Sequence, residues 1–333
     1  MKTVLITALA VLVLAGATLG FAWSRYQQFL QTPLAIPVTG ELFEVQPGYG
    51  GADIVRQLSE RGFTQAGWEW KLLMRLEPAI YRAGEYRLQV GSGPREVLAL
   101  LASGRVVAYQ FTLVEGWTFR QLAQALLADP NLEHVLDLTD PSQWTPSNLF
   151  PDMQHPEGWF LPETYQFTKG DSDRDILLRA HAAMQEALDD AWERRATGLP
   201  LDSPYELLIL ASIIEKETAL EEERGQISGV FVRRLNKRMR LQTDPTVIYG
   251  MGEDFDGDIR RKDLRTDTPY NTYTRHGLPP TPIAMPGRAS LLAAASPEPG
   301  ETLYFVANGK GGHTFSKTLA EHQAAVNKLI GKN

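Results

Sequence analysis

The chain begins with an apolar run that is long enough to cross a lipid bilayer. No charged residue occurs between Thr3 and Trp23, where Val, Leu, Ile and Phe recur. A helix of about 20 such residues spans the hydrocarbon core, whereas a cleaved signal peptide has a shorter apolar core of about 7–15 residues. The run therefore predicts a retained transmembrane anchor at residues 1–25, with a short cytoplasmic start. The small residues Ala15-Gly16-Ala17 resemble a cleavage site, so removal of the segment is the alternative.

The residues that flank this run predict its orientation. Lys2 and the α-amino group favour a cytoplasmic N-terminus, although Arg25 on the far side weakens this bias. Trp23 and Tyr26 follow the run, where aromatic side chains commonly lie at the membrane surface. Residues 26–40 contain two prolines and several polar residues, which predicts a semi-rigid linker. We expect a single-pass protein of the inner membrane whose folded part lies in the periplasm.

An irregular repeat of strand, glycine-rich turn and amphipathic helix follows the predicted linker. The copies are a strand at 43–45 with a helix at 52–61, a strand at 86–88 with a helix at 94–102, and a looser strand at 111–114 with a helix at 118–127. Each copy buries little surface alone, so the copies must pack on one another in a small α+β domain, which we place at 41–110. Its rhythm resembles LysM-type glycan-binding modules; a spacer or packing domain is the alternative.

The remainder of the chain, 111–333, predicts a second domain of helices and short strands. Residues 174–195 have apolar side chains along one side, which is typical of an amphipathic helix. Residues 205–217 are apolar nearly all round, which indicates a central, buried helix. Thr218-Ala-Leu-Glu221 has the pattern of a capping box, which predicts a new helix that continues to about Met239. Loops rich in Pro and Gly then lead to short strands, such as 302–307, and to a closing helix from about Ser316.

Composition excludes several classes of function. The net charge of −7 argues against a nucleic-acid partner, which normally needs a clustered basic face. Cys is absent, so the chain has no disulfide framework, no thiolate ligand and no Cys nucleophile. The six His residues show no metal-ligand spacing, and there is no G-x-S-x-G, H-E-x-x-H or Walker motif. We therefore expect neither a metal nor a cofactor.

Glu217 is the residue whose position best suits acid–base chemistry. It follows Ile213 and Ile214 at i+4 and i+3, so it extends the apolar stripe of the predicted central helix. At a helix C-terminus, the negative end of the macrodipole disfavours a carboxylate, and partial burial does the same. Both effects raise the pKa, as a general acid near neutral pH requires. Glu215 is aligned instead with Ala211 and Ser212. A solvated helix end is the alternative for both carboxylates.

Several segments of the chain strongly resemble the YceG-like family. They are Ala211–Thr218, Leu241–Gly250, Tyr270–Tyr273, Gly277–Pro280 and Gly311–Phe315, with Glu157–Pro162 upstream. The resemblance covers essentially the whole chain; it is specific from Glu157 to Phe315 and weak between about 25 and 150. The family's catalytic glutamate falls on the second Glu of Glu-Lys-Glu-Thr, which is Glu217.

The resemblance implies an endolytic lyase that cleaves peptidoglycan glycan strands. In such a lytic transglycosylase one carboxylic acid protonates the O4 leaving oxygen between N-acetylmuramic acid and N-acetylglucosamine. The resulting carboxylate then accepts the proton of the C6 hydroxyl as that oxygen closes on C1. The product is a 1,6-anhydro end, and neither water nor metal takes part. Ordinary glycosidases need two carboxylates. A peptidoglycan synthase is a plausible protein partner if nascent strands are trimmed.

Other residues of these segments offer groups that suit a sugar-binding cleft. Amide, hydroxyl and carboxylate groups alternate with aromatic rings that stack on sugar faces. The candidate substrate-binding residues are Trp159, Gln242, Thr243, Asp244, Tyr249, Asn271, Tyr273 and His313. For the loop residues among them, turn formation is the alternative, since Asp, Asn and Pro favour turns.

Two other functions remain open at the level of the sequence. A hydrolytic muramidase would use Glu217 together with Glu163 or Asp244 as the second carboxylate. A non-catalytic scaffold of the cell envelope would bind glycan through the LysM-like region alone. The mass of the product distinguishes the first alternative, because hydrolysis adds one water, and a turnover assay tests the second.

Overall fold

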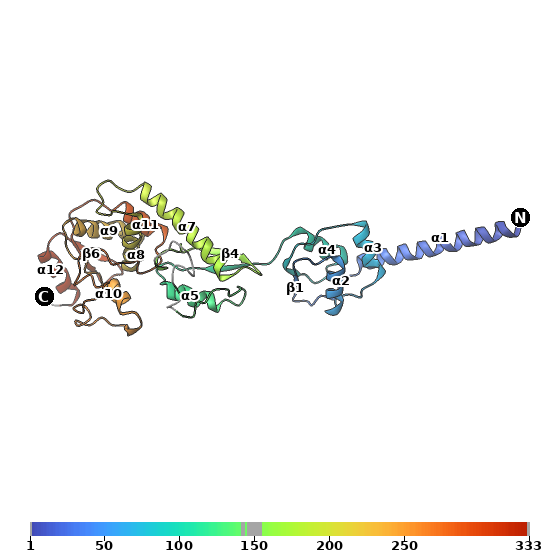
Figure 1. Cartoon of the computed structure of the whole chain (residues 1–333), viewed down its shortest axis with the longest axis horizontal. Coiled ribbons are helices and arrows are strands. Elements are labelled where there is room, and N and C mark those ends of the chain that lie inside the picture. The colour runs from blue at the N-terminus through green and yellow to red at the C-terminus, as the bar shows by residue number, and fades with distance from the viewer. Residues whose placement is uncertain (1, 141–143, 145–154, 332–333) are drawn as a thin grey trace. The chain divides into compact units, whose positions relative to one another are not determined.

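A computed structural model describes residues 2–140, 144 and 155–331 (Figure 1). The contacts divide the chain into two compact units. The first comprises Met1–Tyr109 with Thr168–Gly170, and the second comprises Gln110–Phe167 with Asp171–Asn333. Helices and two-stranded sheets occur along the chain, so the α+β fold class predicted from the sequence is confirmed.

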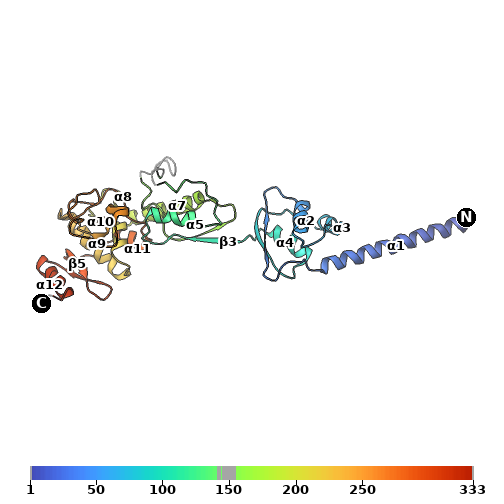
Figure 2. The same cartoon turned by 90° about the horizontal axis from the view of Figure 1, so that it is seen from below.

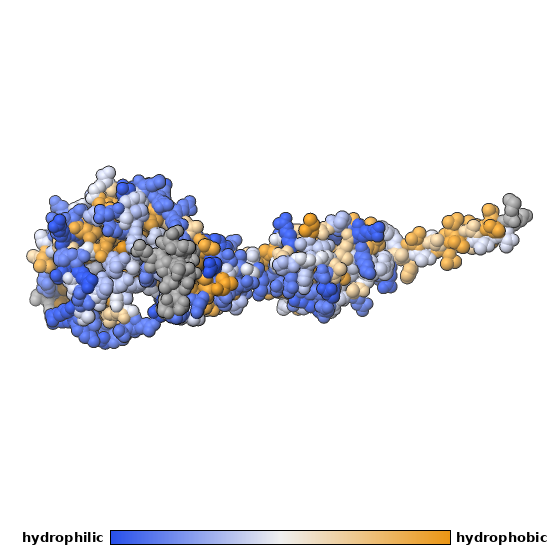
Figure 3. Space-filling model, viewed as in Figure 1, coloured by the Kyte–Doolittle hydropathy of each residue, from blue (hydrophilic) through white to orange (hydrophobic). Residues whose placement is uncertain are grey.

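Among the described residues, one helix is long and apolar enough to cross a membrane. It is the segment Thr3–Gln31 of α1 (Lys2–Gln31), whose most apolar window has a mean hydropathy of 2.4. At about 1.5 Å per residue, about 20 residues cover the roughly 30 Å of a hydrocarbon core. The side chains of Val4, Leu12 and Phe21 are exposed, and Figure 3 shows the apolar surface of this helix in orange. These properties fit a single-pass membrane protein.

The end of α1 packs against the first unit where the sequence suggested a free linker. Tyr26 and Leu34 are 2% and 6% exposed and belong to the core of this unit. Phe29 makes an edge-on contact with Trp70, with 5.2 Å between the ring centroids. The helix continues this far because Pro33 is the first residue that breaks it, and Tyr26 and Phe29 lie on one helical face. Tyr26 is therefore a core residue and does not lie free at a membrane surface.

The first unit is built around one antiparallel strand pair. β1 (Glu41–Val45) and β2 (Gly84–Leu88) pair with Phe43 opposite Tyr86, and both rings are fully buried. Its helices are α2 (Gly51–Glu60), α3 (Trp68–Leu76) and α4 (Pro94–Ser103). The strands, α2 and α4 confirm the predicted elements to within two residues. Helix α3 is absent from the predicted repeat, because it lies between the two copies.

The second unit contains the remaining elements, apart from Ala108 and Tyr109 of β3 and Thr168 of β4. A two-stranded sheet joins β3 (Ala108–Thr112) to β4 (Thr164–Thr168), and β5 (Tyr304–Ala307) pairs antiparallel with β6 (His313–Ser316). The helices are α5 (Phe119–Ala128), α7 (Asp173–Glu193), α8 (Pro204–Glu217), α9 (Glu221–Asn236), α10 (Asp244–Met251), the 3₁₀ turn η2 (Gly252–Asp254), α11 (Arg288–Ala295) and α12 (Leu319–Leu329). The closing helix α12 packs on β5 and β6 (Figure 2).

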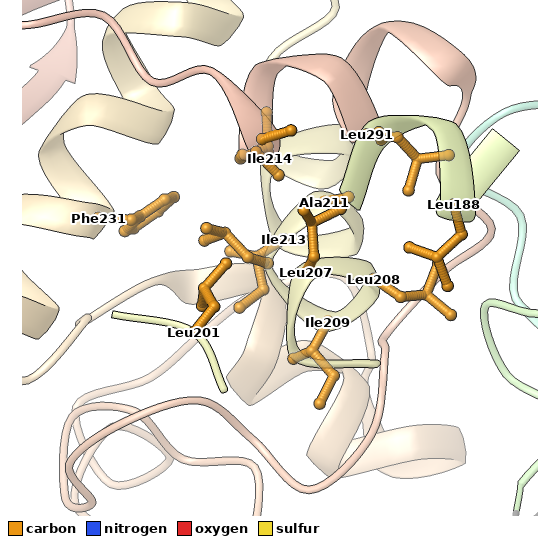
Figure 4. Close-up of a cluster of buried hydrophobic side chains, with 14 of the residues drawn as sticks. Leu188, Leu201, Leu207, Leu208, Ile209, Ala211, Ile213, Ile214, Phe231 and Leu291 are labelled. Atoms are coloured by element: carbon orange, nitrogen blue, oxygen red, sulfur yellow. The ribbon is translucent and has the colours of Figure 1, made fainter. Parts of the chain in front are cut away.

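Helix α8 is the central element of the second unit. Ser203 caps its start by accepting a hydrogen bond from the Glu206 backbone N–H, and Pro204 occupies the first turn, where its missing N–H is tolerated. All eight residues from Leu207 to Ile214 are buried. Figure 4 shows side chains of this cluster from α7, α8, α9 and α11; those labelled are Leu188, Leu207, Leu208, Ile209, Ala211, Ile213, Ile214, Phe231 and Leu291. The prediction of a central, buried helix is confirmed.

The capping box predicted at Thr218 is wrong. Thr218 ends α8, and its hydroxyl accepts a hydrogen bond from the Leu220 backbone N–H at 3.0 Å. Leu220 occupies the cap position of α9, so Glu221 is the first helical residue and not the third. A capping box needs the Thr at the cap and the Glu three residues later. The three residues after α8 are instead used to reverse the chain.

Two short helices occupy a region for which the sequence suggested loops. Helix α10 begins at Asp244-Pro245, because Pro is compatible with the first turn of a helix. Helix α11 begins after Gly287, which offers no side-chain cap of its own. Both helices contact α8, so tertiary packing stabilises segments that are too short to be stable alone.

The central position of α8 predicts a large loss of stability when its core is truncated. Replacement of Leu210, which is fully buried, by Ala should lower the free energy of unfolding by about 2–5 kcal/mol. Leu178→Ala on α7, where the side chain is 47% exposed, serves as the control and should change it by less than about 1 kcal/mol. Denaturant unfolding measures both. Equal losses would show that α8 is not the centre of this core.

Candidate active site

The C-terminal end of α8 opens into a cavity of about 590 Å³. Residues of α8, α9, the segment before α10, β5, β6 and α12 line it, and all of them belong to the second unit. The polar side chains of the lining include Glu217, Arg234, Gln242, Asp244, Tyr273 and His313. Leu241, Tyr304 and Phe305 contribute apolar and aromatic surface. A cavity in which polar groups converge beside apolar and aromatic walls is typical of a ligand site.

Glu217 lies half-buried in this cavity as the last residue of α8. The Thr243 hydroxyl donates a hydrogen bond to its Oε1 atom, and the Thr243 backbone N–H is itself bound to the Thr272 hydroxyl at 3.1 Å. Burial raises the pKa of Glu217 to about 7, and the neighbouring Asp244 acts in the same direction. The hydrogen bond from Thr243 and the charges of His313 and Arg234 oppose this rise in pKa. Glu217 is therefore present in both protonation states near neutral pH.

Glu215 has a different, structural set of contacts. Its Oε2 atom accepts hydrogen bonds from the Gly287 backbone N–H at 3.0 Å and from the Ser290 hydroxyl at 2.8 Å. These are the cap position and the third residue of α11, so Glu215 supplies the side-chain cap that Gly287 lacks. The two carboxylates of this helix end therefore have separate environments, and only Glu217 is part of the cavity lining.

Three of the predicted substrate-binding residues line the same cavity on the segments around α10. Asp244 accepts a hydrogen bond from the Tyr273 hydroxyl at 2.6 Å, which orients both side chains. Gln242 has a positive φ of 53°, and its backbone N–H is bound to the Thr272 carbonyl at 3.2 Å. A positive φ in a residue other than Gly is strained and is often found at functional sites. Thr243 lies between them and contacts Glu217 directly.

His313 reaches the cavity from β6 and is held by Glu223. Its Nδ1 atom lies 2.6 Å from Glu223 Oε2, and its backbone N–H donates to Glu223 Oε1 at 2.7 Å. The hydrogen bond from the His313 backbone fixes the position of the Glu223 carboxylate relative to β6. The arrangement resembles the carboxylate–histidine pairs that set the orientation and tautomer of an imidazole.

Three other predicted substrate contacts are engaged elsewhere. Trp159 stacks on Tyr205 at 5.8 Å and packs against the hydrophobic core. The amide of Asn271, only 1% exposed, binds three backbone groups of its own loop. The Tyr249 hydroxyl donates to Glu157 at 3.0 Å. These contacts are structural, and substrate binding by the three residues stays a prediction.

The proposed second carboxylates also have separate positions. Glu163, the fallback partner of Glu217, forms an exposed ion pair with Arg288 at 3.1 Å. Asp244 lies in the cavity, as described above. Of the two carboxylates considered for a muramidase, only Asp244 therefore shares the site with Glu217.

A second buried acid, Glu157, was not predicted from the sequence. This carboxyl group is 2% exposed and accepts hydrogen bonds from the Phe119 backbone N–H at 2.9 Å and from Tyr249. Burial raises its pKa to about 8, so it is mostly neutral at physiological pH. It links the start of α5 to α10, the helix that follows Thr243, and so stabilises the segment that contacts Glu217. Its place in the Glu157–Pro162 segment was the only available signal.

Arg234, Tyr304 and His322 also line the cavity and were not predicted. Arg234 is one of two adjacent arginines on α9, and no periodicity distinguishes it from its neighbour. Among the residues that the structure describes, no cluster of three or more His, Asp or Glu side chains has the geometry to hold a metal ion.

The fold and the site together define a class of protein: an α+β protein with a glutamate of raised pKa in a polar cavity. The sequence matches the profile of the YceG-like family over residues 43–328. An endolytic murein transglycosylase of Bacillus subtilis (strain 168) is 34% identical over 266 residues, 75% of this chain and 73% of the relative. The chain belongs to the YceG-like family.

Two further similarities agree with this assignment. An endolytic murein transglycosylase of Streptococcus pneumoniae (serotype 2, strain D39) is 28% identical over 72% of this chain; the match covers 50% of that longer relative. A crystal structure of a YceG-like protein from Listeria monocytogenes covers 86% of this chain and 98% of its own, with 32% identity and a TM-score of 0.54.

The raised pKa of Glu217 predicts a pH-dependent gain of stability when the acid is replaced by Gln. Because its pKa rises from 4.5 to about 7 on folding, the folded state binds the proton more tightly. That stabilisation is present below the unfolded pKa and is lost as the pH rises through 7. Glu217→Gln should therefore gain stability relative to the wild type between pH 5 and 8, by up to ~3 kcal/mol.

Unfolding free energies measured across this pH range test the prediction. Glu222→Gln, at an exposed position on α9, is the matched control and should show no such trend. A difference between Glu217→Gln and the wild type that stays constant with pH would contradict the raised pKa.

Proposed function

We propose that this protein is an endolytic lytic transglycosylase that cleaves the bond between N-acetylmuramic acid and N-acetylglucosamine in peptidoglycan strands. The observation that carries the proposal is the half-buried Glu217, whose pKa is about 7, in a polar cavity. The names of the relatives support the choice of substrate and of reaction class. Glu217 serves as the single general acid and base.

The reaction requires two proton transfers through one carboxyl group. Protonated Glu217 donates its proton to O4 as the C1–O4 bond breaks. The C6 hydroxyl oxygen then attacks C1, and the Glu217 carboxylate accepts the hydroxyl proton. The C1–O6 bond closes a 1,6-anhydro ring, and Glu217 is again protonated. A pKa near the working pH suits a group that acts first as an acid and then as a base.

The surrounding side chains have supporting roles in this proposal. Thr243 orients the Glu217 carboxyl group through its hydrogen bond, so that one oxygen remains for the substrate. Gln242, Asp244, Tyr273 and His313 bind the sugar units on either side of the scissile bond, since their polar groups line the same cavity. The hydrogen bond between Tyr273 and Asp244 and the pair of His313 with Glu223 restrict their rotamers before the substrate binds.

The remaining regions suit a position at the cell envelope. We assign α1 as an inner-membrane anchor with a cytoplasmic N-terminus, which leaves the catalytic region, 111–333, in the periplasm. The first unit, with two paired strands and helices between and after them, is assigned as a LysM-like domain at 41–110 that contacts glycan. Trimming of nascent strands would bring the enzyme to a peptidoglycan synthase.

Replacement of the two carboxylates at the end of α8 separates catalysis from structure. Glu217→Gln should keep the fold, because Gln has the same shape and a similar helix propensity. Its rate of strand cleavage should fall by at least about 10²–10⁴-fold, the usual loss for a general acid. Glu215→Gln retains an oxygen for the Gly287 N–H and should lose far less activity.

Release of soluble fragments from purified sacculi measures the rates, and the unfolding midpoint of neither variant may fall below that of the wild type. A Glu217→Gln protein that cleaves at the wild-type rate while Glu215→Gln does not would show that the other carboxylate is catalytic. Activity in both variants would exclude this helix end from the chemistry.

The division of the chain predicts that the second unit acts alone. A fragment from Ala108 onward retains β3 and all residues of the cavity. We expect it to unfold in one cooperative transition and to cleave strands more slowly than the full chain, because the glycan contact of the first unit is lost. Calorimetry and the sacculus assay measure this. Failure of the fragment to fold would show that the two units share a core.

A further inference from the structure

Arg234 is a buried cation in the wall of the active-site cavity. Its side chain projects from α9 and the residue is 7% exposed. The Nε atom donates to the Leu303 carbonyl at 2.6 Å, and Nη1 donates to the carbonyls of Leu241 at 2.8 Å and Arg240 at 3.2 Å. Within the described part of the chain, Nη2 donates to no protein group. One edge of the guanidinium group is therefore free for a ligand.

The charge of this guanidinium group is not compensated by an ion pair. Buried charges in proteins are normally paired with an opposite charge. Among the described residues, no carboxylate oxygen lies within the 4.0 Å limit of an ion pair with Arg234. Glu217 shares the cavity, but it must be protonated, and thus neutral, to act as the acid. At that stage of the reaction Arg234 presents to the substrate a positive charge that no ion pair compensates.

Two rings complete the surroundings of this group. The Arg234 guanidinium carbon lies 5.0 Å from the centre of the Tyr304 ring, and the His322 ring of α12 stacks on Tyr304 at 5.3 Å. The His322 Nδ1 atom is buried and, among the described residues, has no hydrogen-bond partner. An unsatisfied buried nitrogen in a cavity wall is costly unless a ligand or a water binds it.

We propose that Arg234 and His322, which both contact the Tyr304 ring, form a subsite for a carboxylate of the glycan substrate. The inference rests on the proposed function, because it extends the same cavity beyond Glu217. Arginine binds carboxylates through two parallel hydrogen bonds, and Nη2 is the nitrogen available for this purpose. Peptidoglycan carries such groups either as the lactyl carboxylate of N-acetylmuramic acid or on the attached peptide. The subsite thus selects a muramic-acid unit over a neutral sugar.

A purely structural role of Arg234 is the competing explanation, and the adjacent Arg233 provides the control for it. Arg233 donates to the Thr302 carbonyl at 2.7 Å, the Thr302 hydroxyl at 2.8 Å and the Glu298 carbonyl at 2.9 Å. All three of its nitrogens are thus engaged, and it lines a different hollow, outside the active-site cavity. Replacement of either arginine removes comparable contacts with carbonyl groups, but only Arg234 faces the substrate.

The test measures binding of uncleaved strands to the full-length, detergent-solubilised protein with Glu217→Gln, whose amide resembles the protonated acid. Three strands serve as probes: one with its peptides, one without peptides and thus with free lactyl carboxylates, and one whose lactyl carboxylates are converted to neutral amides. Arg234→Gln should raise the Kd roughly tenfold to hundredfold for a strand with the recognised carboxylate, and hardly at all for the neutral strand. Arg233→Gln should leave all three values unchanged.

The pattern of losses identifies the carboxylate. A loss confined to the peptide-free strand assigns the lactyl group, and a loss confined to the peptide-bearing strand assigns the peptide. Equal losses for all three strands, or no loss, would overturn the subsite. If Arg234→Gln does not fold, His322→Ala is tested instead, because His322 is only half-buried. It must show a smaller loss of affinity, again confined to strands that carry the recognised carboxylate. Failure of the wild type to cleave any strand would instead contradict the proposed function, since the binding comparison does not depend on turnover.

Discussion

The burial of one carboxyl group at the end of an apolar helix is the constraint on which the site depends. Helix α8 packs on all sides, so its last residue lies close to the core and loses much of its hydration. Loss of hydration disfavours the charged form and raises the pKa of Glu217 to about 7. The apolar sequence of α8 therefore determines the pKa of Glu217 as well as the fold.

The segments around α8 hold this group in one orientation. Thr243 binds its Oε1 atom, and the Thr272 hydroxyl holds the Thr243 backbone in turn. Glu157 holds α10 in place by accepting a hydrogen bond from Tyr249. Burial raises its pKa as well, so it is mostly neutral near pH 7. The two acids differ in exposure: Glu157 is 2% exposed and accepts a hydrogen bond from a protein donor on each oxygen, whereas Glu217 is only half-buried in its cavity. Raised pKa values alone thus do not identify the catalytic acid.

Local patterns predicted the elements that follow simple periodicity. The apolar run of α1, the strand–helix rhythm of the first unit and the apolar α8 were all recognisable, and Glu217 followed from its alignment with Ile213 and Ile214. Other features depend on contacts between distant segments. The contacts of Asn271 and Trp159, for example, are set by loop and core packing. Arg234 faces the cavity because the carbonyls of Leu303, just before β5, and of Leu241 accept hydrogen bonds from its other two nitrogens.

The identity of the nucleophile at C1 is the most direct test of a single-carboxylate mechanism. Strands are digested by the full-length protein in water labelled with heavy oxygen, and the new ends are analysed by mass spectrometry. A single-carboxylate mechanism predicts 1,6-anhydro ends that carry no label and are lighter by one water than reducing ends, because the attacking oxygen is the C6 hydroxyl of the substrate. Reducing ends that carry one labelled oxygen would contradict it, since water activated by a second carboxylate, such as Asp244, would then be the nucleophile.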